Sequence, residues 1–209
     1  MIRDILRQSV RLAAIGACAV ALSGCISLLP KSKPAQLYRF GQATAAAPAP
    51  VGSVGVFRAN GVFQGESGGD RILTITGGKA AYVADARWVA PASILFDEAV
   101  LAAFDADPGP TRIISRGEQG KADYALRLDV RNFETRYDSG GGAAPTVVVR
   151  IRAALAKADR SNAAETILEA RVRADDNRVG AIVAAYDTAL GEALGKLVAW
   201  TNQNAVPVT

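Results

Sequence analysis

Residues 124–137 have the sequence YALRLDVRNFETRY, and the rest of the fold can be worked out from this stretch. Apolar side chains occupy every second position from Tyr124 to Val130. The positions between them, from Ala125 to Arg131, carry small or charged side chains. This alternation is typical of a β-strand that buries one face and exposes the other to water. We therefore expect a long, half-buried strand here.

Two further strands are expected beside this one. Residues 146–157 alternate in the same way, with Val147, Val149 and Ile151 on one face. Residues 165–173 follow after a turn at Ser161-Asn162. Because both connections are of hairpin length, the three strands should form an antiparallel sheet.

A second hairpin is expected earlier in the chain. The β-branched stretch 71–76 and the stretch 79–84 flank Gly77-Gly78, a pair that favours a tight turn. Shorter strands are expected at 37–40, 51–57 and 111–115.

Two helices complete the expected pattern. Apolar residues recur at three-to-four spacing in 92–104, where Ser93 is the expected cap, and in 179–200, which follows Asp175-Asp176-Asn177 as the expected cap. The sequence thus predicts an α+β domain of two layers, with two helices packed on a mainly antiparallel sheet.

The N-terminal segment has the features of a targeting signal. Arg3, Arg7 and Arg11 flank an uncharged, mostly apolar run over 12–22. That run is short for a membrane span. It ends in Leu22-Ser23-Gly24-Cys25, which resembles the lipobox of bacterial lipoproteins. A plain signal peptide, or a short anchor with an incidental cysteine, is the alternative.

The lipobox resemblance implies a lipidated protein. Residues 1–24 would be a signal peptide that is removed, 25–36 a lipidated tether, and 37–209 a single domain. Cys25 would carry diacylglycerol and an N-linked acyl chain, and two or more chains hold a protein stably on a membrane. Ile26, where an Asp would favour the inner membrane, points to the outer membrane.

Composition argues against several classes of function. The chain has no His and two Cys, Cys18 and Cys25, which fall in or next to the leader. The rest of the chain therefore offers no thiol or imidazole for a metal site or a nucleophile. The net charge of +4 falls to about +2 without the leader, which is poor support for nucleic-acid binding. We expect no enzyme activity, no cofactor and no metal.

Taken together, the chain resembles the ABC-type transport auxiliary lipoproteins, a family that includes the outer-membrane lipoprotein of the Pqi system. The resemblance is carried by Cys25, Leu37-Tyr38-Arg39-Phe40, Arg87-Trp88, the strand at 124–137 and Ala199-Trp200. It implies a domain like the amino-terminal domain of TolB, which can assemble as rings.

The resemblance also implies a function and partners. The protein would be an outer-membrane lipoprotein that faces the periplasm and serves an Mce-type (MlaD-like) protein and its inner-membrane ABC transporter. The cargo would be phospholipid or another apolar molecule. The alternative is a ring-forming lipoprotein of a secretion or envelope-assembly system. A hydrolase that uses carboxylates such as Asp97 and Glu98 is a third, weaker hypothesis.

Several residues could contact a partner or simply stabilise the fold. Arg87, Trp88 and Trp200 are candidate interface anchors, because Arg and Trp are favoured in interfaces. Trp88 could equally pack in the core where strand meets helix, with Arg87 paired locally. Arg127, Asp129 and Arg131 could line a ring interface or solvate the exposed face of the sheet.

Overall fold

The computed structural model describes residues 34–41, 53–114, 117–118, 120–159, 161 and 163–206. From Ala35 onward the chain forms one compact unit. Its elements are β1 (Gln36–Tyr38), β2 (Val54–Arg58), the short 3-10 helix η2 (Gly65–Gly68), β3 (Arg71–Thr76), β4 (Lys79–Trp88), α2 (Ala92–Asp105), β5 (Thr111–Ile114), β6 (Tyr124–Arg136), β7 (Thr146–Lys157), β8 (Ala164–Arg173) and α3 (Val179–Asn204). The predicted order of strands and helices is confirmed.

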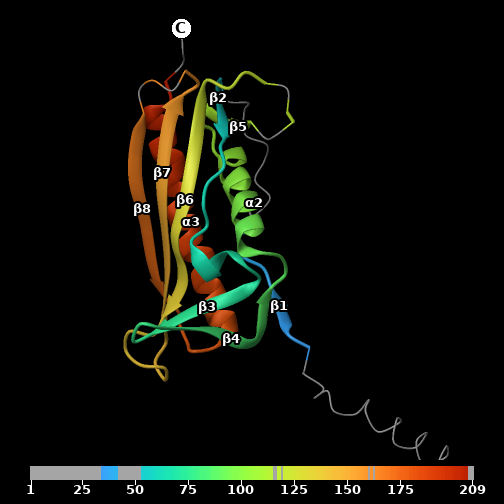
Figure 1. The fold of residues 1–209 in the computed structure, drawn as a ribbon, viewed down its shortest axis with the longest axis vertical. Helices are drawn as coiled ribbons and strands as arrows, with labels where there is room; N and C mark the ends of the chain where they lie inside the picture. Colours follow the sequence, from blue (N-terminus) through green and yellow to red (C-terminus); the bar gives the residue numbers. More distant parts are fainter. Residues whose placement is uncertain are drawn as a thin grey trace, which may run out of the picture. The chain divides into compact units, whose positions relative to one another are not determined.

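The long strand β6 is the centre of an open, eight-stranded sheet. One edge of β6 pairs antiparallel with β7 along almost its whole length, and β7 pairs antiparallel with β8. The other edge is shared, because β2 runs parallel to the start of β6 and β3 runs parallel to its end. The predicted α+β class is confirmed, and these parallel pairings make the sheet mixed (Figure 1).

A β-bulge divides β6 into two halves. Val130 lies opposite Ile151 and Asn132 lies opposite Arg150, so Arg131 is an extra residue with no partner in β7. An inserted residue exchanges the two faces of a strand from that point on. Accordingly, the even-numbered residues up to Val130 are buried beneath the helices. After the bulge the odd-numbered residues Phe133 and Thr135 are buried there.

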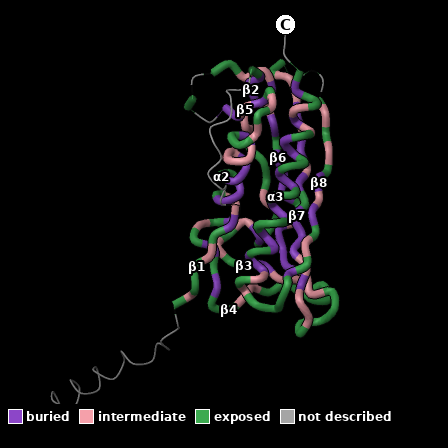
Figure 2. The backbone as a smooth tube through the Cα atoms, turned by 180° about the vertical axis from the view of Figure 1, so that it is seen from behind, coloured by how far each residue is buried: buried purple, intermediate pink, exposed green. Residues whose placement is uncertain are grey.

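Both helices cover the same face of the sheet. α3 packs on β7 and β8, and α2 packs against α3 and β5. Figure 2 shows the buried residues concentrated on the inner strands and on the sides of the helices that face them. The predicted apolar stripe of α3 is buried, including Ile182, Leu190 and Leu197.

The two predicted helix caps are wrong. α2 begins after Pro91, so that Ser93 lies inside the helix, and α3 begins after Arg178 with no capping side chain. The carboxylate of Asp176 instead accepts hydrogen bonds from the Asn177 backbone N–H and from Arg178. Local turn bonds of this kind compete with helix capping.

An aromatic cluster joins the sheet to α3. The rings of Phe133 and Tyr186 lie 4.8 Å apart, and Phe40 lies 5.0 Å from Phe133. Trp88 contacts Phe40 and Tyr186 edge to face. The Thr135 hydroxyl donates to the Tyr186 hydroxyl at 3.2 Å, and burial raises the pKa of Tyr186. The cluster therefore fixes the segment after β1, the end of β4, β6 and α3 against one another.

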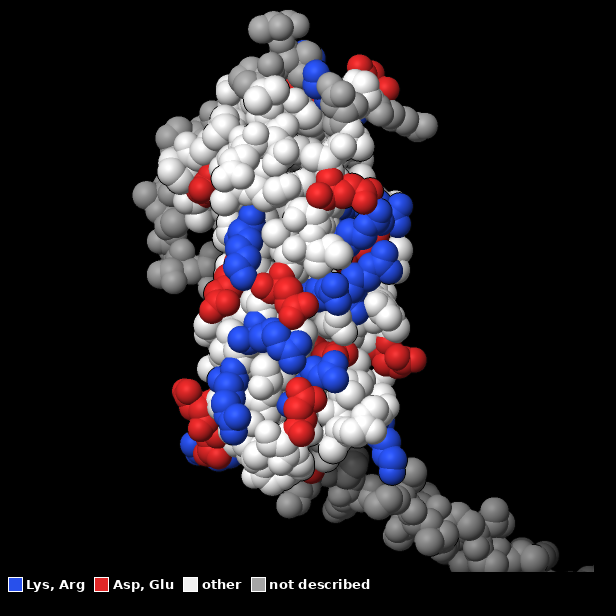
Figure 3. All heavy atoms as spheres, turned by 90° about the vertical axis from the view of Figure 1, so that its left-hand side faces the viewer, with Lys and Arg blue, Asp and Glu red and all other residues white. Residues whose placement is uncertain are grey.

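The outer face of β6, β7 and β8 carries a network of charges. Acidic and basic side chains alternate on the side of the molecule where β8 lies (Figure 3). At its centre the buried Asp129 accepts from Arg127 at 3.0 Å and from the Val62 backbone N–H at 3.1 Å. Arg131 and Arg152 lie within 3.8 Å of the same carboxylate.

These contacts determine how Asp129 titrates. Burial disfavours the carboxylate, but the hydrogen bonds from Arg127 and Val62 and the charges of Arg127 and Arg131 outweigh it. The pKa of Asp129 is therefore held below its ordinary value.

The core position after the bulge can be tested by truncation. We expect Phe133→Ala to lower the free energy of unfolding by about 3–5 kcal/mol, because it opens a cavity inside the aromatic cluster. Ile167→Ala in β8 is the control, since Ile167 is 56% exposed. It should cost at most about 0.5 kcal/mol. Urea denaturation measures both values, and similar small losses would mean that Phe133 is not a core residue.

The role of Asp129 can be tested through pH. A carboxyl group with a lowered folded-state pKa adds stability above its unfolded pKa of about 3.9, and loses it as the pH falls through the folded value. We expect Asp129→Asn to lower the free energy of unfolding at pH 7 by about 1–3 kcal/mol. The deficit should be smaller at low pH, once the pH has fallen through the lowered folded-state pKa and the wild-type carboxylate is protonated.

The matched control for Asp129 is Asp138→Asn. Asp138 also pairs with two arginines, Arg136 and Arg171, but its side chain is 58% exposed. Its substitution should change the free energy of unfolding by at most about 0.5 kcal/mol. An equal deficit for Asp129→Asn at both pH values would show that charge is not the source of its effect.

Candidate functional site

The residues singled out in the sequence do not form one site. Cys25 lies outside the described residues. Trp88 is 2% exposed and packs in the aromatic cluster, whereas Arg87 is exposed and pairs with Asp70 at 2.8 Å. Trp200 is partly buried near the end of α3, about 20 Å along the helix from Tyr186, the residue that Trp88 contacts.

The charged residues of the outer face are largely paired with one another. Arg152 bridges Asp129 and Glu165, and Arg150 lies 3.5 Å from Glu169. The two carboxylates considered for a hydrolase, Asp97 and Glu98, contact different arginines. Asp97 pairs with Arg58, and the neighbouring Glu98 pairs with Arg39. Two carboxylates held by different partners do not make the facing pair that acid–base hydrolysis needs.

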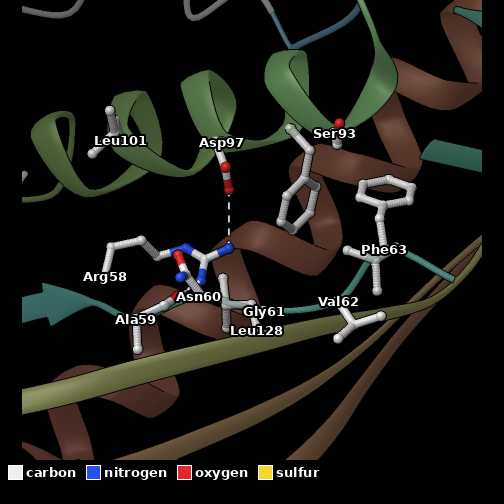
Figure 4. A pocket seen from close by; sticks show the side chains of 12 residues that line it. Arg58, Ala59, Asn60, Gly61, Val62, Phe63, Ser93, Asp97, Leu101 and Leu128 are labelled. Carbon is white, nitrogen blue, oxygen red and sulfur yellow. Dashed lines mark hydrogen bonds and ion pairs between the residues drawn. The ribbon is translucent and has the colours of Figure 1, made fainter. Parts of the chain in front are cut away.

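A cavity of about 400 Å³ lies between α2 and the segment that follows β2 (Figure 4). This segment, residues 59–63, runs along β6 and bonds to it, with Ala59 N–H donating to Leu126 and Val130 N–H donating to Val62. Gly61 is required here, because a Cβ at this position would lie 1.7 Å from the carbonyl oxygen of Leu128. The close approach forms the floor of the cavity.

One wall of the cavity is apolar. Phe63 and Phe96 meet edge to face at 5.8 Å, and both line the cavity. Leu101, Leu128 and Val130 also line the cavity, and Leu101 and Leu128 lie on the side of Arg58 (Figure 4). Such a surface favours an apolar group.

The opposite side of the cavity holds a desolvated cation. The side chain of Arg58 is 17% exposed. Its Nη2 donates to Asp97 at 2.9 Å and its Nη1 donates to the carbonyl of Ala59 at 2.6 Å. Burial lowers the pKa of Arg58 from its ordinary value, against the opposing effect of Asp97 and, more weakly, Asp129.

Arg58 also keeps unused hydrogen-bond donors. Its Nε is buried and has no partner among the described residues, and each Nη uses one of its two N–H groups. A guanidinium has five donors, so three remain. The side chains of Asn60 and Ser93, which also line the cavity, have no hydrogen bond within the described part of the chain.

A second, wider groove of about 840 Å³ runs between α2 and α3. Its lining is mostly small, with Ala99, Ala103 and Gly191 among the residues. Arg39, Asp107 and Asp187 supply charge at its rim. Asp187 is already engaged, because it accepts from the backbone N–H of Gly41 at 2.7 Å.

Sequence reasoning missed Arg58. In the sequence it is a charged residue at the end of a short strand, followed by the turn pair Asn60-Gly61. Its burial comes from α2, which begins more than thirty residues later. The pair Asn60-Gly61 was the available signal, because a glycine outside a hairpin can mark a close backbone approach.

The described residues were also compared with the requirements of a metal site and of a membrane span. No three or more His, Cys, Asp or Glu side chains among them lie close enough to hold a metal ion. No described helix combines the length and apolar character that crossing a membrane requires.

Comparison with solved structures identifies the fold. A crystal structure of a Xanthomonas campestris protein of the DUF330 family is similar, with a TM-score of 0.68 and 22% identity over 81% of this chain and 96% of that chain. A crystal structure of an uncharacterized protein has a TM-score of 0.63 and 10% identity over 80% of this chain and 99% of that one. No curated protein sequence matches this chain significantly.

The sequence match to a family is more specific. The model of the family described as "ABC-type transport auxiliary lipoprotein component" matches residues 70–198, from just before β3 to the last turns of α3. This span is more than half of the chain, and the chain therefore belongs to the family of ABC-type transport auxiliary lipoproteins.

Proposed function

We propose that this protein is an outer-membrane lipoprotein that tethers an Mce-type ABC transport system, which carries phospholipids or other apolar molecules across the periplasm. The observation that carries the proposal is the family match over residues 70–198. Energy would come from the ABC transporter in the inner membrane, and the auxiliary protein would act by binding rather than by catalysis.

The N-terminal sequence supports a lipid-anchored position. Leu22-Ser23-Gly24-Cys25 supplies the lipidation signal, and Ile26 favours the outer membrane. Gln36, the first residue of β1, lies eleven positions after Cys25 in the sequence. An extended chain spans at most about 3.6 Å per residue, so the domain would stay within about 40 Å of the acylated cysteine. A protein held so close to the membrane is suited to receive a periplasmic partner there.

The partners follow from the same proposal. An Mce (MlaD-like) protein would meet the domain in the periplasm, and several copies would assemble as a ring. The paired charges of the outer sheet face suit a wet, polar contact of this kind, because charge complementarity fixes register more than it adds affinity. Nucleic acid is not expected as a partner.

The anchor can be tested with two cysteine variants. We expect Cys25→Ala to move the protein from the membrane fraction to the soluble fraction, because the acyl chains that hold it would be absent. Cys18→Ala is the matched control, since Cys18 lies in the apolar run that would be removed, and it should leave the protein in the membrane. Cell fractionation and immunoblotting measure the distribution. Full membrane retention of Cys25→Ala would contradict the lipid anchor.

The transport partner can be tested in the same strains. A pull-down from mildly solubilised membranes, analysed by mass spectrometry, should recover an Mce-type protein with its ABC subunits. Cys25→Ala should reduce this recovery, whereas Cys18→Ala should not. Recovery of a polymer exporter or synthase instead would replace the proposal with a secretion or envelope-assembly role.

A further inference from the structure

We propose that the cavity beside Arg58 binds an anionic amphiphile, with a carboxylate or phosphate head on the guanidinium and an apolar chain against Phe63 and Phe96. This inference rests on the proposed function, because it names a ligand that an auxiliary of lipid transport would hold.

The first argument is the state of Arg58. Taking a cation out of water costs free energy, and proteins offset that cost with paired charges and complete hydrogen bonding. Arg58 has one ion pair, with Asp97, whose own side chain is 61% exposed. Its Nε lacks a partner within the described residues, and three of its five N–H groups are unused. An acidic head group supplies the acceptors that this cation lacks.

The second argument is the shape and polarity of the cavity. The guanidinium of Arg58 lies on one side of the cavity and Phe63 lies on the other (Figure 4). Phe96, which contacts Phe63, also lines the cavity. A volume of about 400 Å³ lies within the usual range for small-molecule sites. A purely polar anion would leave the apolar wall unused, and a purely apolar ligand would leave Arg58 unsatisfied. An amphiphile satisfies both.

The third argument concerns Asp97. Its carboxylate occupies one N–H of Arg58, and it stands at the exposed end of the cavity on α2. An incoming anion would meet the negative charge of Asp97 and would compete with it for the guanidinium. Asp97 therefore lowers the affinity of the cavity for an anion, and removing its charge should strengthen anion binding.

The fixed backbone supports a preformed site. Gly61 lies directly on β6, and the segment that carries Val62 is bonded to Val130 and Asp129. Little ordering is then left for the ligand to induce, which favours affinity.

The test uses the full-length chain with Cys25→Ala, so that the protein carries no acyl chains of its own. Equilibrium dialysis with radiolabelled dodecanoate or dodecyl phosphate, below their aggregation concentrations, measures affinity for the two head groups. Dodecanol is the uncharged control, and inorganic phosphate is the competitor that lacks a chain. We expect saturable binding of one or both anions, much weaker binding of dodecanol, and no displacement by phosphate.

Three variants then separate the contributions. Arg58→Gln should weaken binding of the anionic probe by about tenfold or more, because it removes a charge-assisted contact. Asp97→Asn should strengthen binding several-fold, a gain that a misfolded protein could not produce. Arg39→Gln is the matched control, since Arg39 forms a similar ion pair with Glu98 on α2 but does not line this cavity. It should leave the affinity unchanged.

Several outcomes would overturn the inference. These are equal binding of dodecanol and dodecanoate, equal binding by Arg58→Gln and the parent chain, weaker binding by Asp97→Asn, or displacement by inorganic phosphate. The full-length chain includes the apolar residues 12–22, which could bind the probes themselves. Such binding would be equal in all variants, so a difference between Arg58→Gln and the parent chain must come from the cavity. If the binding test fails, the proposed tethering function still stands, provided that Cys25→Ala releases the protein from the membrane and the wild-type chain recovers the Mce-type partner.

Discussion

The extra residue in β6, Arg131, is the constraint on which the rest of the structure depends. If β6 alternated regularly through Arg131, with no bulge, Phe133 would face water and Glu134 would face the helices. With the bulge, Val130 and Phe133 both reach the core, and Phe133 meets Tyr186 of α3. One inserted residue thereby aligns two unlike halves of a strand with one pair of helices, at the cost of a local break in the ladder.

Charged side chains lie on both sides of residues 59–63. On the outer face Asp129 accepts from the backbone of Val62, and on the helical side Arg58 pairs with Asp97. The segment therefore lies between an anion held by arginines and a cation held by one exposed carboxylate. The first arrangement is well satisfied and stabilises the fold, whereas the second is incompletely satisfied and is better suited to binding.

Local pattern was enough to predict the elements but not their contacts. Alternation up to Val130 predicts β6, and the apolar stripe with Tyr186 predicts α3, because each reflects one buried face. The spacing of three between Val130 and Phe133 was a sign of the bulge that alternation alone did not reveal. Predicted caps such as Ser93 failed because neighbouring segments decide where a helix begins. The burial of Arg58 depends on α2, which is distant in the sequence, so no local sequence pattern predicts that burial.

The short strand β1 has a mechanical consequence. It is the first element after the N-terminal segment, it pairs parallel with the end of β4, and Phe40 follows it into the aromatic cluster. Any pull on the chain before residue 34 would reach the domain first at β1. The pairing of β1 with β4 and the packing of Phe40 in the aromatic cluster are the contacts that would oppose it. The domain would resist tension at the very point where a membrane anchor would apply it.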